Sequence, residues 1–505
     1  MSNVSSSPQV IALREPCLVA FETVLGDFHE QGIRYCCWKS SQRVASAMLG
    51  DSDLDLLVGE NDQYSAERVL LENGFKRFQA VPNRDDPAIT CYLGFDEASG
   101  RLVHIDLYSR LVTGERLLKN YRIPWERELL AHSMRHPTLP VQILEPAMEA
   151  LVLVVRVCLE LQRTDLVTLR HWNATQQKFA TDRDALRQCV DRDQLRQLAG
   201  ELLGEPLADA VVETFYGGRA LGGLESLRSR IKAHFAPHRT YNAFEARLRS
   251  TWRTVLWLAG GANKRWGHLP RPWSRRAPGA GKVVALLGVD GSGKSTQLAA
   301  SRAWLGAEVD VMPIYFGTGD GRPSLILWPL KTLLPLISAL LPERPRGSSH
   351  GCVTDKAPGR VYSFLLVGWA TVVAVEKHFK LLKAHRAASR GLMVLADRYP
   401  QDADLAYNDG PLLHRLTGIP DWLRRFEARA YALATRLPPD LILVLDVSPE
   451  TAARREPSMD PAVILDRIGR VRCLEFPGAR VVRINGERPL PDVVTAVKRE
   501  IWRLM

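Results

Sequence analysis

Apolar runs alternate with amphipathic segments through the second half of the chain. The apolar runs predict strands at 282–289, 392–397, 441–447 and 479–485, and the periodicity after the first run predicts a helix at 294–306. Strands that are apolar throughout are typical of parallel sheets covered by helices. The pattern therefore predicts an α/β fold built on a doubly wound parallel sheet.

The first hundred residues show a different mixture of patterns. An amphipathic pattern at 17–37 predicts a helix, and a short strand follows near 33–38. Further strands are expected at 54–58 and 102–109, with a helix at 64–73 between them. These elements predict a small α/β unit at the N-terminal end.

Composition along the chain suggests where these regions separate. Between about residues 125 and 260 the apolar spacing is helical, whereas 262–282 is rich in proline, glycine and basic residues and reads as a linker. The expected organisation is an α/β domain at 1–120, a helical domain at 121–261, a basic linker at 262–282 and a second α/β domain at 283–505.

Two apolar stretches are candidates for membrane contact. The stretch 324–342 approaches the roughly 20 residues that span a bilayer, but it contains internal prolines and a lysine. Peripheral membrane contact through 324–342 therefore fits better than a spanning helix. The stretch 362–375 is too short to span and leads into a charged helix. For both stretches a buried helix of a globular core is the alternative.

Composition and charge restrict the class of protein. With 505 residues, 46% hydrophobic and 24% charged, the chain is ordinary globular material rather than disordered, collagen-like or coiled-coil protein. Its eight cysteines form no CxxC pair, which disfavours a disulfide scaffold and a zinc ribbon. No signal-peptide pattern is visible at the start, so a cytoplasmic location is expected. The net charge of +11 suits nucleotides, nucleic acid or a phospholipid surface, and equally a solvated arginine-rich surface.

The strongest chemical signal is a phosphate-binding loop that begins at Gly288. The sequence GVDGSGKST matches the GxxxxGK[ST] pattern, follows an apolar strand and opens a helix. The glycines allow the backbone to wrap phosphate oxygens, Lys294 would bridge the β- and γ-phosphates, and Ser295 would bind Mg²⁺. The residues expected to bind ATP are Gly288, Asp290, Gly291, Ser292, Gly293, Lys294, Ser295 and Thr296.

A second polar motif follows the predicted strand at 392–397. Asp397 and Arg398 would lie at the carboxyl edge of the sheet, where ligands bind in such folds. Asp397 could hold Mg²⁺ through water, and Arg398 could make a bidentate contact with an acceptor phosphate. A simple salt bridge at the strand end is the alternative interpretation.

Together these motifs resemble the thymidylate kinase family of nucleoside monophosphate kinases over residues 283–505. The resemblance is carried by GVDGSGKSTQ, ADRYPQDADLAYNDG and PDLILVLDVSPETAARR. It implies that Asp290 faces the acceptor's sugar, that Ala406-Tyr407 belongs to the acceptor motif, and that 451–472 forms a lid. The arginines that the lid offers are Arg454, Arg455, Arg467, Arg470 and Arg472, of which Arg454 and Arg467 are the preferred catalytic candidates.

The chain also departs from that family around the acceptor. The family's REPGGT-type segment is missing, residues 324–360 look inserted, and the expected acceptor-binding arginine corresponds to Glu376 or Lys377. The resemblance therefore supports the phosphoryl donor more strongly than thymidylate as the acceptor.

Three N-terminal carboxylates form a second candidate site. Asp53 and Asp55 lie two apart in a predicted strand and so share a face, and Asp106 can join them from a later strand to hold Mg²⁺. With Lys39-Ser40 upstream, residues 17–120 resemble the minimal nucleotidyltransferase fold, which usually has Gly-Ser at that position. The alternative is an inactive binding domain with acidic turn residues.

Two functions of different classes follow from the sequence. The first is ATP- and Mg²⁺-dependent phosphoryl transfer to a nucleoside monophosphate (dTMP to dTDP) or a related acceptor, joined to a nucleotidyltransferase head. The second is a nucleotide-controlled binding protein whose helical middle and basic linker engage membrane or nucleic acid. The expected partners are a nucleotide and a small phosphate acceptor, and a homodimer is left open.

Overall fold

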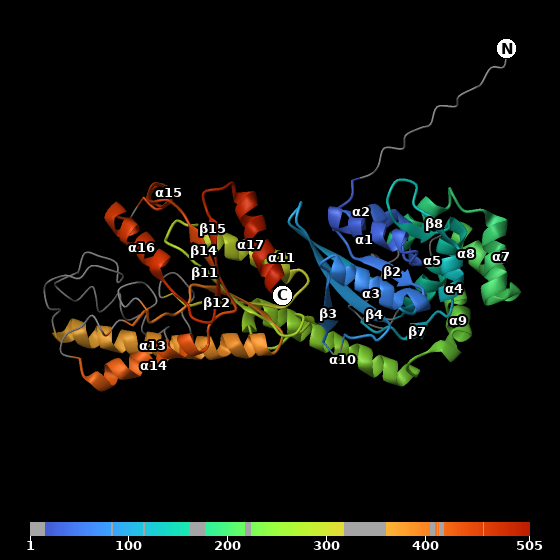
Figure 1. Ribbon diagram of the computed structural model, residues 1–505. Coiled ribbons are helices and arrows are strands. Elements are labelled where there is room, and N and C mark those ends of the chain that lie inside the picture. The colour runs from blue at the N-terminus through green and yellow to red at the C-terminus, as the bar shows by residue number, and fades with distance from the viewer. Residues whose placement is uncertain are drawn as a thin grey trace, which may run out of the picture. The chain divides into compact units, whose positions relative to one another are not determined.

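The chain folds into two compact units, Met1–Ala262 and Asn263–Met505 (Figure 1). Both contain helices and a sheet with parallel strand pairs, so the expected α/β class is confirmed. The structure is a computed structural model that describes residues 16–81, 84–114, 117–160, 177–217, 224–317, 360–403, 410–411, 413, 419–457 and 459–505.

The first unit is built on a mixed sheet. Its strands follow the order β3 (Lys76–Ala80), β4 (Ile89–Asp96), β5 (Arg101–Tyr108), β2 (Leu54–Val58), β1 (Tyr35–Cys37), β9 (Gln142–Leu144) and β8 (Ser133–Arg135). The β2–β5 and β1–β9 pairs are parallel, and the other pairs are antiparallel. The strands expected near 33–38, at 54–58 and at 102–109 are confirmed.

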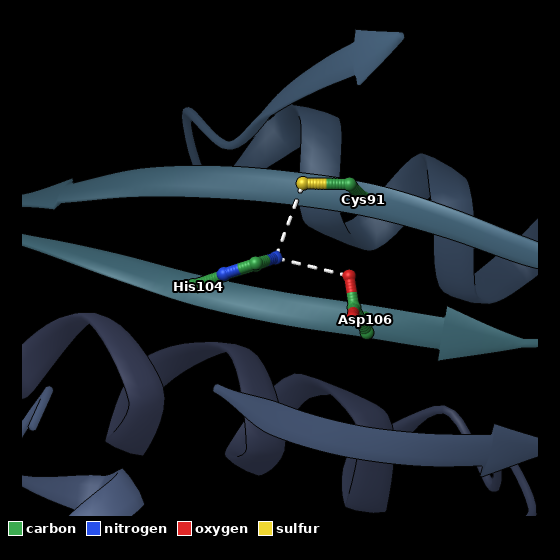
Figure 2. A group of neighbouring side chains, drawn as sticks. All are labelled: Cys91, His104 and Asp106. Carbon is green, nitrogen blue, oxygen red and sulfur yellow. Dashed lines mark hydrogen bonds and ion pairs between the residues drawn. The ribbon is translucent and has the colours of Figure 1, made fainter. Parts of the chain in front are cut away.

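The two faces of this sheet differ in chemistry. One face carries Leu54, Leu56 and Val58 into a hydrophobic core with α1 (Val19–Glu30) and α3 (Gln63–Glu72). On the opposite face, Asp106 of β5 lies directly between Asp55 of β2 and Cys91 of β4. His104 lies two residues before Asp106 and shares its face (Figure 2). The sheet register therefore gathers four chemically reactive side chains.

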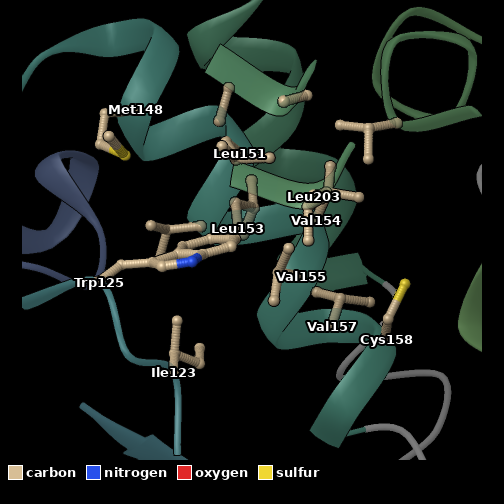
Figure 3. Close-up of a cluster of buried hydrophobic side chains, with 14 of the residues drawn as sticks. Ile123, Trp125, Met148, Leu151, Leu153, Val154, Val155, Val157, Cys158 and Leu203 are labelled. Atoms are coloured by element: carbon tan, nitrogen blue, oxygen red, sulfur yellow. The ribbon is translucent and has the colours of Figure 1, made fainter. Parts of the chain in front are cut away.

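Helix α5 (Pro146–Glu160) is the centre of the helical part of this unit. Its sequence is apolar on nearly every side, and Leu151, Val154 and Val155 are buried among surrounding helices (Figure 3). Helix α10 (Ala243–Ala262) ends the unit, and the helices that pack on α5 are α7 (Arg192–Leu203), α8 (Glu205–Tyr216) and α9 (Leu224–His234). A helix that is apolar all round needs burial on all sides, which these neighbours supply.

The start of the expected helical domain is partly strand. Within it, β7 (Tyr121–Arg122) pairs antiparallel with β6 (Val112–Thr113) of the preceding region, β8 and β9 belong to the main sheet, and α4 (Glu126–Ala131) is short. Strands of two or three residues are too short to show an alternating pattern, so the sequence did not reveal them. From α5 onward the described elements of this unit are helices.

The second unit contains a sheet in which every strand pair is parallel. The order is β12 (Val311–Tyr315), β13 (Met393–Asp397), β11 (Val283–Leu287), β14 (Leu441–Asp446) and β15 (Arg480–Asn485). The four strands expected in this region are confirmed, whereas β12, whose VMPIY run contains a proline, was missed.

Helices connect and cover these strands. They are α11 (Lys294–Gly306), α13 (Arg360–Ser389), α14 (Asp421–Arg436), α15 (Pro449–Arg455), α16 (Pro461–Cys473) and α17 (Leu490–Leu504). Helix α11 contacts α17, and α13 contacts α14. The helix expected at 294–306 is confirmed.

The boundary between the units coincides with the start of the expected linker. Helix α10 ends at Ala262, and a helical turn, Asn263–Gly267, follows it. The backbone N–H groups of Trp273 and Ser274 donate to Asp310 Oδ2 at 2.9 and 2.7 Å. Part of the segment expected to be a linker is therefore fixed to the second unit.

The stretches considered for membrane contact have separate outcomes. The stretch 324–342 lies outside the described residues, as do Ala406 and Tyr407. The stretch 362–375 lies within α13. Among the helices that the structure describes, none combines the length and the apolar character needed to cross a bilayer.

Candidate functional site

The glycine-rich loop joins β11 to α11 and is shaped by close backbone approaches. A Cβ atom at Gly288 would lie 2.6 Å from Ser292 Oγ, and one at Gly291 would lie 2.9 Å from the Ala452 carbonyl oxygen. Gly291 also has φ of 78°, and Gly293, which precedes α11, has φ of 93°. This left-handed backbone favours glycine, so the loop holds its form because of its glycines.

Asp290, inside the loop, is the focus of several cationic side chains. Its Oδ1 accepts a hydrogen bond from Arg398 Nη2 at 2.9 Å, and its Oδ2 accepts one from Arg467 Nη1 at 2.5 Å. Lys294 Nζ lies 4.0 Å from Oδ1. Three positive groups meet one carboxylate, which leaves a surplus of two positive charges among these four residues. Such a surplus favours an anionic ligand.

Arg398 is held in an unusual backbone conformation. Its φ of 66° lies in the left-handed region, which costs a non-glycine residue on the order of 1 kcal/mol. The next residue, Tyr399, is buried, and its hydroxyl donates to the Leu437 carbonyl oxygen. The anchored tyrosine keeps the strained arginine in place, a combination that is common at functional sites.

The remaining loop residues differ in exposure. Lys294 is buried, and its Nζ donates to the Val289 carbonyl oxygen at 2.7 Å. Ser292 is buried too, whereas Ser295 and Thr296 are exposed in the first turn of α11. The loop therefore places its ammonium beneath the backbone, and only the hydroxyl residues Ser295 and Thr296 lie toward solvent.

Asp397 is the last residue of β13 and pairs with residues near the ends of the two neighbouring strands. It lies opposite Leu286 of β11 and Tyr315 of β12, at the carboxyl edge of the sheet. A half-buried carboxylate and the exposed hydroxyl of Ser295 are hard oxygen donors, which is the donor chemistry that Mg²⁺ prefers. Both residues therefore offer the donor atoms that a magnesium site would need.

The lid arginines separate into two groups. Arg467 is buried against Asp290, and Arg455 donates to the Gly291 carbonyl oxygen at 3.4 Å. Arg454 is exposed at the end of α15, while Arg470 and Arg472 pair with Asp466 and Asp446. Of the two preferred arginines, the structure thus brings Arg467 to the loop and leaves Arg454 exposed. Arg455, which was not a preferred candidate, reaches the loop as well.

The position expected to hold an acceptor phosphate has its own ion pair. Glu376 and Lys377 are both buried in α13. Glu376 Oε1 lies 2.9 Å from Lys380 Nζ, which also donates to the Tyr315 carbonyl oxygen at 2.7 Å. Lys377 lies over the Tyr431 ring, 5.0 Å from its centroid. Lys380, which the sequence did not single out, therefore points toward the end of β12.

The first unit has a separate polar cleft of about 360 Å³. Its lining includes Lys39, Ser40, Asp53, Asp55 and Arg156. Lys39 Nζ forms an ion pair with Asp55 and lies 3.0 Å from the Tyr108 hydroxyl oxygen. An ammonium thus occupies one side of Asp55, where the sequence led us to expect Mg²⁺.

The other two expected metal ligands flank a histidine. Asp53 Oδ1 lies 2.7 Å from His104 Nδ1, and Asp106 Oδ1 lies 2.9 Å from His104 Nε2. Cys91 Sγ lies 3.1 Å from the same Nε2 atom. The sheet register brings Asp55 and Asp106 side by side as expected, but Asp53 and Asp106 lie at opposite nitrogens of His104. His104 and Cys91 were not recognised from the sequence.

A buried acid supports the turn that borders the cleft. Glu149 of α5 is only 3% exposed, and its Oε1 accepts a hydrogen bond from the Ser41 backbone N–H at 2.8 Å. Burial raises the pKa of Glu149 from its ordinary 4.5 to about 7, although the Ser41 hydrogen bonds work in the opposite direction. The carboxyl group of Glu149, which supports this turn, therefore changes its charge near neutral pH.

Comparison with known proteins gives relatives for part of the chain. No family model matches it. It is 29% identical over 227 residues to the Escherichia coli K12 "Uncharacterized ATP-binding protein YghS", covering 44% of this chain and 92% of the relative. It is 28% identical over 230 residues to "Uncharacterized ATP-binding protein YghR" of the same strain, covering 43% and 86%. The likeness concerns less than half of this chain.

Proposed function

We propose that the second unit binds ATP with Mg²⁺ and transfers the γ-phosphoryl group to a nucleoside monophosphate or a related phosphate acceptor. The observation that carries this proposal is the convergence of Arg398 and Arg467 on Asp290 within the glycine-rich loop. The two relatives are named as ATP-binding proteins, which supports the donor half of the proposal.

The donor would be held by the loop and the first turn of α11. Backbone N–H groups at a helix N-terminus favour phosphate oxygens, and Lys294 adds a positive charge that is already held at the loop. Mg²⁺, when bound, would neutralise charge on the β- and γ-phosphate oxygens. Ser295 and Asp397 are the residues that would hold it.

The acceptor would lie on the other side of Asp290. In this reaction an acceptor oxygen attacks the γ-phosphorus, and the bond to the β–γ bridging oxygen breaks to release ADP. Arg398 would orient the acceptor phosphate, because a guanidinium can make two parallel hydrogen bonds to phosphate oxygens. Arg467 would offset charge on the transferring group. A nucleotide-controlled switch that transfers no phosphoryl group would not need Arg398 and Arg467 in addition to Lys294.

The proposal is tested by ATP consumption with a panel of acceptors. The full chain is incubated with MgATP and each nucleoside monophosphate, dTMP included, and with sugar acceptors. Lys294→Ala should abolish acceptor-dependent ADP release. Lys282→Ala is the matched control, because Lys282 precedes the other end of β11 and pairs with Asp440. It should retain wild-type turnover.

Two results would count against the proposal. If no acceptor raises turnover above that of Lys294→Ala, phosphoryl transfer by this unit is wrong. If MgATP binds with the same affinity in wild type and Lys294→Ala, the loop is not the donor site. Tight MgATP binding without acceptor-dependent turnover would favour the nucleotide-controlled binding protein.

A further inference from the structure

Three potential metal ligands converge on one face of the first sheet. Cys91 Sγ, His104 Nε2 and Asp106 Oδ1 all lie within 4.8 Å of one another. Cys91 and Asp106 are directly paired across β4 and β5, and His104 precedes Asp106 by two residues (Figure 2). The backbone register itself thus fixes the group, because directly opposite residues and residues two apart share a face.

Hydrogen bonds alone do not easily account for the close contacts within this group. A neutral imidazole carries one proton for its two nitrogens, and Asp53 Oδ1 lies 2.7 Å from Nδ1. A proton on the Nδ1 side would leave Nε2 with a lone pair that faces a carboxylate at 2.9 Å and a thiol at 3.1 Å. The single thiol proton can form a hydrogen bond in only one of these contacts. A cation bound among the three atoms would be coordinated by all of them.

The geometry points to a binding site for a divalent cation of the zinc class, held by Cys91, His104 and Asp106. Thiolate, imidazole and carboxylate are the ligands that Zn²⁺ uses, with bonds of about 2.0–2.3 Å. Tetrahedral ligands at that range lie roughly 3.5 Å apart. The two contacts to Nε2, at 2.9 and 3.1 Å, therefore need to open by only a few tenths of an ångström. Binding would release the thiol proton of Cys91 to solvent.

Asp53 would act as a positioning residue for this site. Its carboxylate lies at the Nδ1 atom of His104, which leaves Nε2 directed at the other two ligands. A carboxylate behind a metal-binding histidine fixes the ring orientation and raises its basicity. Loss of such a partner commonly weakens metal affinity by about 10–100-fold.

The site would border the polar cleft of the first unit. Asp53 lines that cleft, and Asp55, which also lines it, is the direct sheet neighbour of Asp106. Three protein ligands leave a fourth tetrahedral position for water or an incoming donor atom. The assignment does not depend on phosphoryl transfer by the second unit.

Cobalt(II) titration of the chelator-treated full chain tests the assignment, because a cobalt–thiolate bond produces a near-ultraviolet charge-transfer band. We expect the band to saturate near one equivalent, to disappear on addition of Zn²⁺ and to persist in excess Mg²⁺. It should be lost in Cys91→Ser and kept in the control Cys189→Ser, since Cys189 is an exposed cysteine. Asp53→Asn should keep the band but weaken cobalt affinity by about 10–100-fold.

A wild-type chain without the band, or Cys91→Ser with an unchanged band, would overturn the assignment. So would complete displacement of Co²⁺ by Mg²⁺, which would indicate a site of hard oxygen ligands. If Cys91→Ser does not fold, alkylation of the wild-type chain decides the question. Zn²⁺ should protect Cys91 from modification, as mapped by mass spectrometry, and equal labelling with and without Zn²⁺ would refute the site.

Discussion

Replacing Glu149 by glutamine should make the first unit less sensitive to alkaline pH. The wild-type carboxyl is buried in α5 and contacts the Ser41 backbone N–H, which a glutamine oxygen can equally accept. Burial raises the pKa of Glu149 in the folded chain to about 7, from 4.5. Because the folded pKa is the higher one, the stabilising contribution of the protonated acid is complete below about pH 4.5 and is lost as pH rises through 7.

The size of the effect follows from the two pKa values. A shift of about 2.5 units corresponds to roughly 3 kcal/mol over the full titration, at about 1.4 kcal/mol per unit. Between about pH 5 and pH 8 the wild type should therefore lose about 2.5 kcal/mol of unfolding free energy relative to Glu149→Gln. Glutamine stays neutral throughout, so the difference between the two chains isolates this carboxyl.

Urea unfolding should be followed by a probe that belongs to the first unit, because a two-unit chain need not unfold in one step. Cys158 is buried in α5, about two and a half turns beyond Glu149, and a brief alkylation pulse at fixed pH reports whether that helix has opened. Glu30→Gln, at an exposed position in α1, is the matched control, and its difference from wild type should stay within a few tenths of a kcal/mol.

A constant stability difference between wild type and Glu149→Gln across this pH range would refute the reasoning. It would mean that the folded chain accommodates the carboxylate as well as the acid. The hydrogen bond from Ser41 and the nearby Arg156 would then outweigh burial, since both favour the charged form.

Three further predictions concern the second unit. Gly291→Ala should weaken MgATP binding at least tenfold by calorimetry, because φ of 78° alone costs about 1–2 kcal/mol for alanine, whereas Gly306→Ala has free space and should bind normally. Arg467→Ala should lower kcat by roughly 10²-fold or more, and the exposed Arg454→Ala by less than about threefold, in steady-state assays. Burial lowers the pKa of His385, so its stabilising contribution is present above about pH 6.5 and is lost in acid; thermal unfolding of His385→Asn should vary less with pH below that value.

The glycine-rich loop between β11 and α11 was predictable because its pattern is contained in nine consecutive residues. The spacing from Gly288 to Thr296, an apolar strand before it and a helix after it were all visible in the sequence. Local order of this kind needs no knowledge of distant contacts. The same holds for the strands of the second sheet, since each is a continuous apolar run.

The arginines of the expected lid show that local sequence patterns cannot distinguish the roles of two adjacent residues. Arg454 and Arg455 are adjacent in the sequence, and nothing in their neighbours indicates which one turns toward the loop. In the structure both side chains are exposed, but Arg455 reaches the Gly291 carbonyl oxygen. Successive helical residues point about 100° apart, so a one-residue difference decides which of the two cations reaches the loop.

The cysteine–histidine–aspartate group could not be found from spacing at all. Cys91 is 15 residues from Asp106, and a pattern search treats that separation as arbitrary. What joins them is the antiparallel register of β4 on β5, which depends on every pair from Ile89–Tyr108 to Asp96–Arg101. A shift of one residue would turn Cys91 to the opposite face. The chemistry of this sheet face therefore depends on how the strands pair. That pairing is set by the burial of the apolar residues that lie between the reactive positions along each strand.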